Sequence, residues 1–103
     1  MTREAIANAR RIVVKIGSSS LSSREGGLDV AKLRAFVGAI ADRRTNADIV
    51  VVTSGAIATG LAPLGLTRRP TDLPTQQAAA AVGQGLLFAQ YTQAFAERDL
   101  VVA

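Results

Sequence analysis

The stretch Ile49–Gly60, IVVVTSGAIATG, decides the fold class of this chain. It begins as an unbroken apolar run, passes through Thr-Ser-Gly, and continues as a second apolar stretch with small residues mixed in. The first part is typical of a strand in a parallel sheet that helices cover on both faces. The second part predicts a short helix from about Ala56 to Leu64. The turn between them has two interpretations: Ser54 caps the helix, or the turn binds an anionic small molecule.

The sequence on either side predicts alternating strands and helices. Asp29 is a good N-cap, and the apolar residues after it recur with helical spacing. The expected elements are a helix at 2–10 capped by Thr2, a strand at 11–16, a polar loop at 17–29, an amphipathic helix after Asp29, the strand at 49–53, the helix at 56–64, a long helix from a Thr75 cap to about Arg98, and a third strand starting at Leu100. This order favours an α/β fold with a mostly parallel sheet.

The composition excludes several kinds of site. The chain has 103 residues without cysteine or histidine, which excludes disulfides, thiolate metal sites and histidine acid–base catalysis. An enzyme of this composition works with lysine, hydroxyls, carboxylates and backbone amides. The formal net charge is +4, but the arginine pairs are scattered and no aromatic residue is interleaved with them, so they are interpreted as solvated surface. Apolar runs are far shorter than the ~20 residues of a membrane span. We therefore expect a cytoplasmic protein without a nucleic-acid or membrane partner.

Small residues follow both predicted strands. Gly17 and Ser18 follow the first, and Ser54, Gly55 and Ala56 follow the second. Parallel strands bring both turns to one edge of the sheet, where ligands of open α/β sheets bind. Backbone N–H groups of such turns can hold a carboxylate or a phosphate.

Lys15 lies two residues before the end of the first strand, and a lysine beside an anion-binding turn is typical of phosphoryl-transfer sites. A surface lysine and ordinary turns remain the alternative. Gly83 and Gly85 lie inside the long predicted helix and are interpreted as packing positions. The chain has no P-loop motif and no complete G-x-G-x-x-G motif.

Three segments resemble the amino-acid kinase family: VVKIGSSSL (Val13–Leu21), VVVTSGAIATG (Val50–Gly60) and AAAAVGQ (Ala78–Gln84). Within that family they are most similar to the enzymes whose acceptor is L-glutamate, and LGLTRRPTDLPTQQ (Leu64–Gln77) also fits. The resemblance implies a three-layer α-β-α fold, incomplete in this chain. It also implies that ATP phosphorylates the side-chain carboxylate of L-glutamate to glutamyl 5-phosphate, the first step of proline biosynthesis.

The same resemblance assigns roles by position. Lys15 is the expected catalytic residue and stabilises the transferring phosphoryl group, while Gly17 and Ser18 line the path of the ATP phosphates. Ser54 binds glutamate, and Gly55 and Ala56 offer backbone contacts. The family implies ATP and Mg²⁺ as cofactors, although no metal ligand is identified in this sequence. It also implies homo-oligomers and feedback inhibition by proline.

The family continues well beyond Ala103. We therefore expect residues 1–103 to be the N-terminal, acceptor-binding part of an amino-acid kinase domain, without the nucleotide half and any PUA domain, and inactive alone. Two alternatives stay open: a non-catalytic α/β module that binds an anion or regulates, and another member of the same family.

Overall fold

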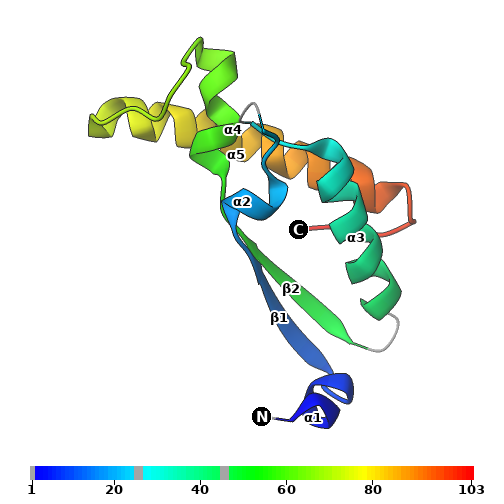
Figure 1. Ribbon diagram of the computed structural model, residues 1–103. Coiled ribbons are helices and arrows are strands. Elements are labelled where there is room, and N and C mark those ends of the chain that lie inside the picture. The colour runs from blue at the N-terminus through cyan, green and yellow to red at the C-terminus, as the bar shows by residue number, and fades with distance from the viewer. Residues whose placement is uncertain (1, 25–26, 45–46) are drawn as a thin grey trace.

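The computed structural model describes residues 2–24, 27–44 and 47–103 (Figure 1). Its elements, in chain order, are α1 (Arg3–Ala7), β1 (Arg11–Ile16), α2 (Ser18–Leu21), α3 (Val30–Arg44), β2 (Asp48–Thr53), α4 (Ala56–Leu61), the 3₁₀ helix η1 (Ala62–Leu64) and α5 (Leu73–Ala96). The first strand has its predicted bounds. The helix expected from Ala56 to Leu64 is confirmed as α4 followed by η1.

The two strands form a parallel pair, as predicted. The register runs from Arg11 opposite Asp48 to Ile16 opposite Thr53. Beyond the last pair, the Ser54 N–H donates a hydrogen bond of 3.3 Å to the Ile16 carbonyl, so the two chains separate only after this point. The turns that begin at Gly17 and Ser54 therefore lie at the same edge of the sheet.

Helices cover one face of this sheet. The inward-facing residues Val14, Ile16, Ile49 and Val51 pack against a core that α2, α3 and α5 supply. The other face carries Val13, Val50 and Val52, which are 65%, 49% and 47% exposed. The expectation that β2 is covered on both faces is therefore wrong for the described chain, which forms two of the three layers. Valines such as Val50 and Val52 are usually buried, but nothing in the described part of the chain covers this face of β2.

The core lies between α3 and α5. Leu33 and Val37 of α3 and Leu87 of α5 are almost completely buried. Tyr91 stacks on Phe95 and meets Phe36 edge-on, with ring centroids 6.4 and 6.5 Å apart. The apolar stripe predicted for the helix after Asp29 is the face that α3 turns toward α5.

The helices α4 and α5 approach each other through glycines. A Cβ on Gly60 would overlap the Ala79 carbonyl, and a Cβ on Gly83 would overlap the Ala56 carbonyl. The packing interpretation is confirmed for Gly83. It is wrong for Gly85, because the space next to Gly85 is open.

The start of α5 differs from the prediction. The N-cap is Asp72, whose carboxylate accepts the Thr75 N–H at 3.0 Å, and the helix ends at Ala96. Asp and Thr are both capping residues, but Pro74 fits the first turn of a helix, where its missing N–H costs nothing. That position places the cap at Asp72.

The predicted third strand is not formed. Asp99 has φ of 59°, and the Leu100 N–H donates to the Phe95 carbonyl at 3.0 Å, which turns the chain back from the end of α5. Leu100 and Val102 then pack against the core. The segment follows the helical layer because its first amide bonds to the helix and Leu100 and Val102 are partly buried there, while Val101 stays 96% exposed, so it makes no ladder with β2.

Two further predictions fail locally. The segment expected as a polar loop begins with the helical turn α2, and an isolated antiparallel bridge joins Ser22 to Leu28; residues 25–26 of that segment lie outside the described residues.

The short N-terminal helix is confirmed, with Thr2 as its cap. Arg43, interpreted as solvated, donates to the Ala7 carbonyl at 2.6 Å and so ties α3 to the end of α1.

Candidate functional site

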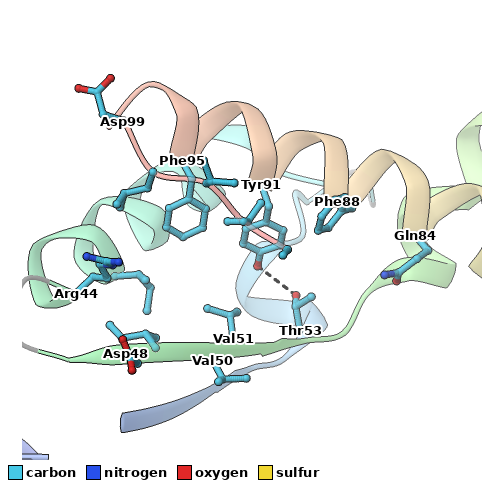
Figure 2. Close-up of a pocket in the computed structure, with 16 residues that line it drawn as sticks. Arg44, Asp48, Val50, Val51, Thr53, Gln84, Phe88, Tyr91, Phe95 and Asp99 are labelled. Carbon is cyan, nitrogen blue, oxygen red and sulfur yellow. Dashed lines mark hydrogen bonds between the residues drawn. The ribbon is translucent and has the colours of Figure 1, made fainter. Parts of the chain in front are cut away.

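A groove of about 810 Å³ lies between β2 and α5, and Figure 2 shows its side chains. Tyr91 reaches down from α5, and its hydroxyl donates to Thr53 Oγ1 at 3.2 Å. Phe88 and Phe95 line the same wall, and the segment from Leu100 to Ala103 closes another side. The one cation in its lining, Arg44, shares the groove with the carboxylates of Asp48 and Asp99, and the two hydroxyls are bonded to each other, so the groove suits an anion poorly and is not the candidate site.

A smaller cavity of about 320 Å³ lies at the carboxyl edge of the sheet. It is lined by Ser18, Ser54, Gly55, Ala56, Ile57, Ala58 and Arg69. Its volume is near the lower end of the range of small-molecule sites, roughly 300–1,000 Å³. Four of the six residues predicted for the site line it, so the topology brings the two turns together as expected.

The turn after β2 is built on a glycine. Gly55 has φ of 101°, a left-handed conformation that residues with a side chain rarely adopt. A Cβ on Gly55 would also lie 3.4 Å from the Ser18 Cβ, so the two turns are in close contact. Glycine is required here for its left-handed backbone, since a Cβ at that distance would make only an ordinary van der Waals contact.

Ser54 does not cap α4. The N-cap is Gly55, and no side chain caps that helix end. The Ser54 hydroxyl is exposed in the cavity and donates to the Ile16 carbonyl at 3.4 Å, a long hydrogen bond. The capping interpretation of Ser54 is therefore wrong, and its hydroxyl is available to a ligand in the cavity.

Gly17 and Ser18 form the turn after β1. Gly17 is the N-cap of α2, and nothing lies within 4 Å of the Cβ position that it leaves empty. Ser18 is exposed and reaches the cavity, whereas Gly17 does not line it. The first turn thus contributes one side chain to the cavity.

Lys15 is not brought into the cavity. It pairs with Val52 in the register and is exposed on the uncovered face of the sheet with Val13 and Val50. Within the described residues its ammonium group makes no ion pair. Its predicted role in catalysis stays a prediction.

Arg69 is the lining residue that sequence reasoning missed. It was interpreted as half of a solvated arginine pair, yet the structure places it in the cavity wall with Ser18 and Ser54. The sequence offered one signal that Arg69 has a defined position. It directly precedes Pro70, which restricts its backbone, and it lies in the stretch that resembles the family.

The described residues also bear on two other kinds of site, metal centres and membrane spans. In ranges 2–24, 27–44 and 47–103, no group of three or more acidic side chains is placed to hold a metal ion. No helix within those ranges is both long and apolar enough to cross a membrane.

Comparison with known proteins agrees with the predicted fold class. The family model described as the amino acid kinase family matches residues 10–103, so this chain belongs to that family. Among curated proteins it is similar to glutamate 5-kinases. It is 57% identical to that of Thermobifida fusca over 99% of this chain and 26% of the relative. It is 62% identical to that of Bifidobacterium animalis subsp. lactis over 90% of this chain and 25% of the relative. The chain thus spans about a quarter of the length of these relatives.

Proposed function

We propose that the protein carrying this segment is a glutamate 5-kinase, which uses ATP to phosphorylate the side-chain carboxylate of L-glutamate in the first step of proline biosynthesis. The observation that carries the proposal is the small cavity at the sheet edge, whose wall includes the turn Ser54–Ala56 of a chain 57% and 62% identical to two glutamate 5-kinases. A small cavity lined by hydroxyls and one arginine suits a small dicarboxylate better than a flat protein or nucleic-acid partner.

The acceptor side of the reaction belongs to the turn after β2. In this proposal the Ser54 hydroxyl donates to a carboxylate of glutamate, and the backbone at Gly55 and Ala56 holds it in place. An exposed hydroxyl with one long hydrogen bond of 3.4 Å can redirect its proton to a ligand at little cost.

The phosphate side belongs to the turn after β1. Open space at Gly17 and the exposed Ser18 fit a phosphate group, and the ammonium of Lys15, which makes no ion pair with the described residues, fits charge on the transferring phosphoryl group. ATP with Mg²⁺ would supply the phosphoryl group and neutralise part of its charge. The described residues hold no group of three or more acidic side chains placed to bind the metal. In this proposal the chain's own contacts to ATP are those to the phosphates.

The remaining assignments extend this proposal to the whole protein. Residues 1–103 form the acceptor half of the kinase domain, and the nucleotide half and any PUA domain lie outside them. The protein is cytoplasmic, assembles as a homo-oligomer, and is inhibited by proline. The 103-residue chain alone does not catalyse transfer, because donor, metal and acceptor must be held in line.

An assay of acyl phosphate formation tests the activity and the choice of acceptor together. The full-length gene product is incubated with ATP, Mg²⁺ and L-glutamate, and the acyl phosphate is trapped with hydroxylamine. The 103-residue chain is assayed in the same way. In separate reactions, L-aspartate or N-acetyl-L-glutamate replaces L-glutamate as the acceptor. We expect hydroxamate only from the full-length protein, and only when L-glutamate is the acceptor. Turnover with another acceptor would instead indicate a different member of the family. Glutamate binding without any turnover would favour a non-catalytic module.

A further inference from the structure

We propose that Arg69 binds the α-carboxylate of the acceptor amino acid and thereby sets the specificity of the cavity. This inference rests on the proposed function, because it assumes that the cavity holds L-glutamate. It assigns a ligand contact to a residue outside the strand-end turns.

The loop that carries Arg69 is fixed at both ends. At its start, the Leu66 N–H donates to the Leu61 carbonyl at 2.9 Å. At its end, the Gln76 side-chain amide donates to the Pro70 carbonyl at 2.9 Å. Because Arg69 directly precedes Pro70, its backbone is also restricted to extended conformations. The loop therefore returns Arg69 to the cavity along a defined path.

The charge of Arg69 has no partner in the described part of the chain. Three other arginines do have partners there: Arg34 pairs with Glu97, Arg43 bonds to the carbonyls of α1, and Arg98 pairs with Asp42. Arg69 is the one charged side chain among the residues that line the cavity, where the other lining residues are small, apolar or hydroxylated. A guanidinium group without a counterion beside serine hydroxyls matches the geometry of a carboxylate, which it binds through two parallel hydrogen bonds.

Chemistry decides which of the two carboxylates of glutamate Arg69 takes. The side-chain carboxylate must attack the phosphoryl group, and a bidentate guanidinium would withdraw electron density from the attacking oxygens. The α-carboxylate does not react, so pairing it with arginine helps binding without that penalty. Arg69 extends from the loop after η1, whereas the phosphate side of the site follows β1. Glutamate therefore lies with its α-carboxylate toward Arg69 and its side chain toward the strand ends.

The test compares Arg69→Ala, Arg69→Lys and the matched control Arg68→Ala in the full-length gene product. Arg68 is the adjacent arginine and does not line the cavity. Each variant is assayed with L-glutamate and with 4-aminobutyrate, which keeps the reacting carboxylate but lacks the α-carboxylate. Thermal unfolding of each variant checks that the fold is retained.

We expect Arg69→Ala to raise the KM for L-glutamate about 10- to 100-fold, the usual effect of losing a charged hydrogen bond, with kcat changed much less. The kcat/KM for 4-aminobutyrate should be almost unchanged, because that compound has no group for Arg69 to bind. Arg69→Lys should recover part of the loss, and Arg68→Ala should behave as wild type.

The outcomes distinguish this inference from the proposed function. A wild-type protein without activity on L-glutamate overturns both. An active wild type whose Arg69→Ala variant keeps its KM overturns the assignment of Arg69 alone. An equal loss with both substrates also overturns it, since Arg69 would then act on the reacting end or on the fold.

Discussion

The hydroxyl of Tyr91, in α5, donates a hydrogen bond of 3.2 Å to the side chain of Thr53, the last residue of β2. The next residue is Ser54, in the wall of the candidate site. One polar contact thus fixes the end of the strand against the long helix, directly before the turn that forms the cavity. Because Tyr91 is otherwise packed between aromatic rings, this contact gives the helix a defined position along β2.

Removing that hydroxyl should destabilise the fold without disturbing the aromatic packing. Tyr91→Phe keeps the ring but removes the donor to Thr53 Oγ1, whose remaining hydrogen bond is its own donation of 3.3 Å to the Ser54 carbonyl, so we expect the free energy of unfolding to fall by about 1 kcal/mol. Urea denaturation measures the difference. In the matched double variant with Thr53→Val, no hydroxyl is left unpaired, and part of the loss should return. A Tyr91→Phe variant as stable as wild type would mean that this hydrogen bond does not hold the strand.

The same residue predicts a pH dependence at the alkaline end. Burial raises the pKa of Tyr91 above its ordinary value of 10.0. A raised pKa in the folded state means that its stabilising contribution is complete below about pH 10 and is lost as the pH rises through the folded pKa. Tyr91 is the only tyrosine, so absorbance of the phenolate reports it directly. We expect a midpoint above 10.0 in the folded protein. Tyr91→Phe should lose less stability above that pH, and equal slopes would contradict this account.

Asp72 predicts the opposite behaviour in acid. The side chain of Thr75, followed by its backbone N–H, donates to the carboxylate and lowers the pKa of Asp72 below its ordinary value of 3.8. A lowered pKa gives a contribution that is present above about pH 4 and lost as the pH falls through the folded pKa. Asp72→Asn keeps the cap without the charge, so its melting temperature should change less between pH 6 and pH 2 than that of wild type. Thr75→Val, which removes the strongest donor, should reduce the wild-type slope. A slope in Asp72→Asn as steep as that of wild type would assign the pH dependence to other carboxylates.

The two glycines of α5 should respond in opposite directions to the same change. Gly83→Ala places a methyl group against the Ala56 carbonyl and forces α4 away, and overpacking of this kind costs about 1–3 kcal/mol. Gly85→Ala enters open space, where replacing glycine in a helix stabilises by up to about 1 kcal/mol. Chemical denaturation of the two variants is the measurement. Equal effects would show that the close approach of the helices tolerates a side chain.

Local signals explain what the sequence could predict. The valine-rich run of β2, its glycine turn and the Asp29 cap all act over a few residues, so the strands, the parallel order and the meeting of Ser18 with Ser54 were predictable. The third strand at Leu100 was not, because a strand forms only where a neighbouring chain accepts its hydrogen bonds. The exposure of one face of β2 could not be predicted either, because an apolar sequence indicates that a strand favours burial but not whether other elements cover it.

The position of Arg69 in the cavity wall also could not be predicted from the sequence. Its place in the cavity depends on hydrogen bonds that bring a loop back toward an edge formed much earlier in the chain, and no periodicity encodes such a return. The side-chain amide of Gln76 supplies one of those bonds, to the Pro70 carbonyl. The residues missed by sequence reasoning are those that tertiary contacts place.

The last prediction separates binding from catalysis in the full-length gene product. Ser54→Ala removes one hydroxyl from the acceptor site, and a neutral hydrogen bond acts alike on bound substrate and transition state. We therefore expect the KM for L-glutamate to rise roughly 2- to 10-fold at nearly constant kcat. Lys15→Ala removes a charge whose effect grows as the phosphoryl group moves, so kcat should fall about 100- to 1,000-fold with a smaller change in KM.

Steady-state kinetics at saturating ATP give both constants. The matched control is Lys32→Ala, because Lys32 bonds to the Ser22 carbonyl away from the cavity and should leave turnover unchanged. Lys15 faces the uncovered side of the sheet in this chain, so unchanged turnover in Lys15→Ala would show that its ammonium group never reaches the transferring phosphoryl group. An unchanged KM in Ser54→Ala would place glutamate away from the turn after β2.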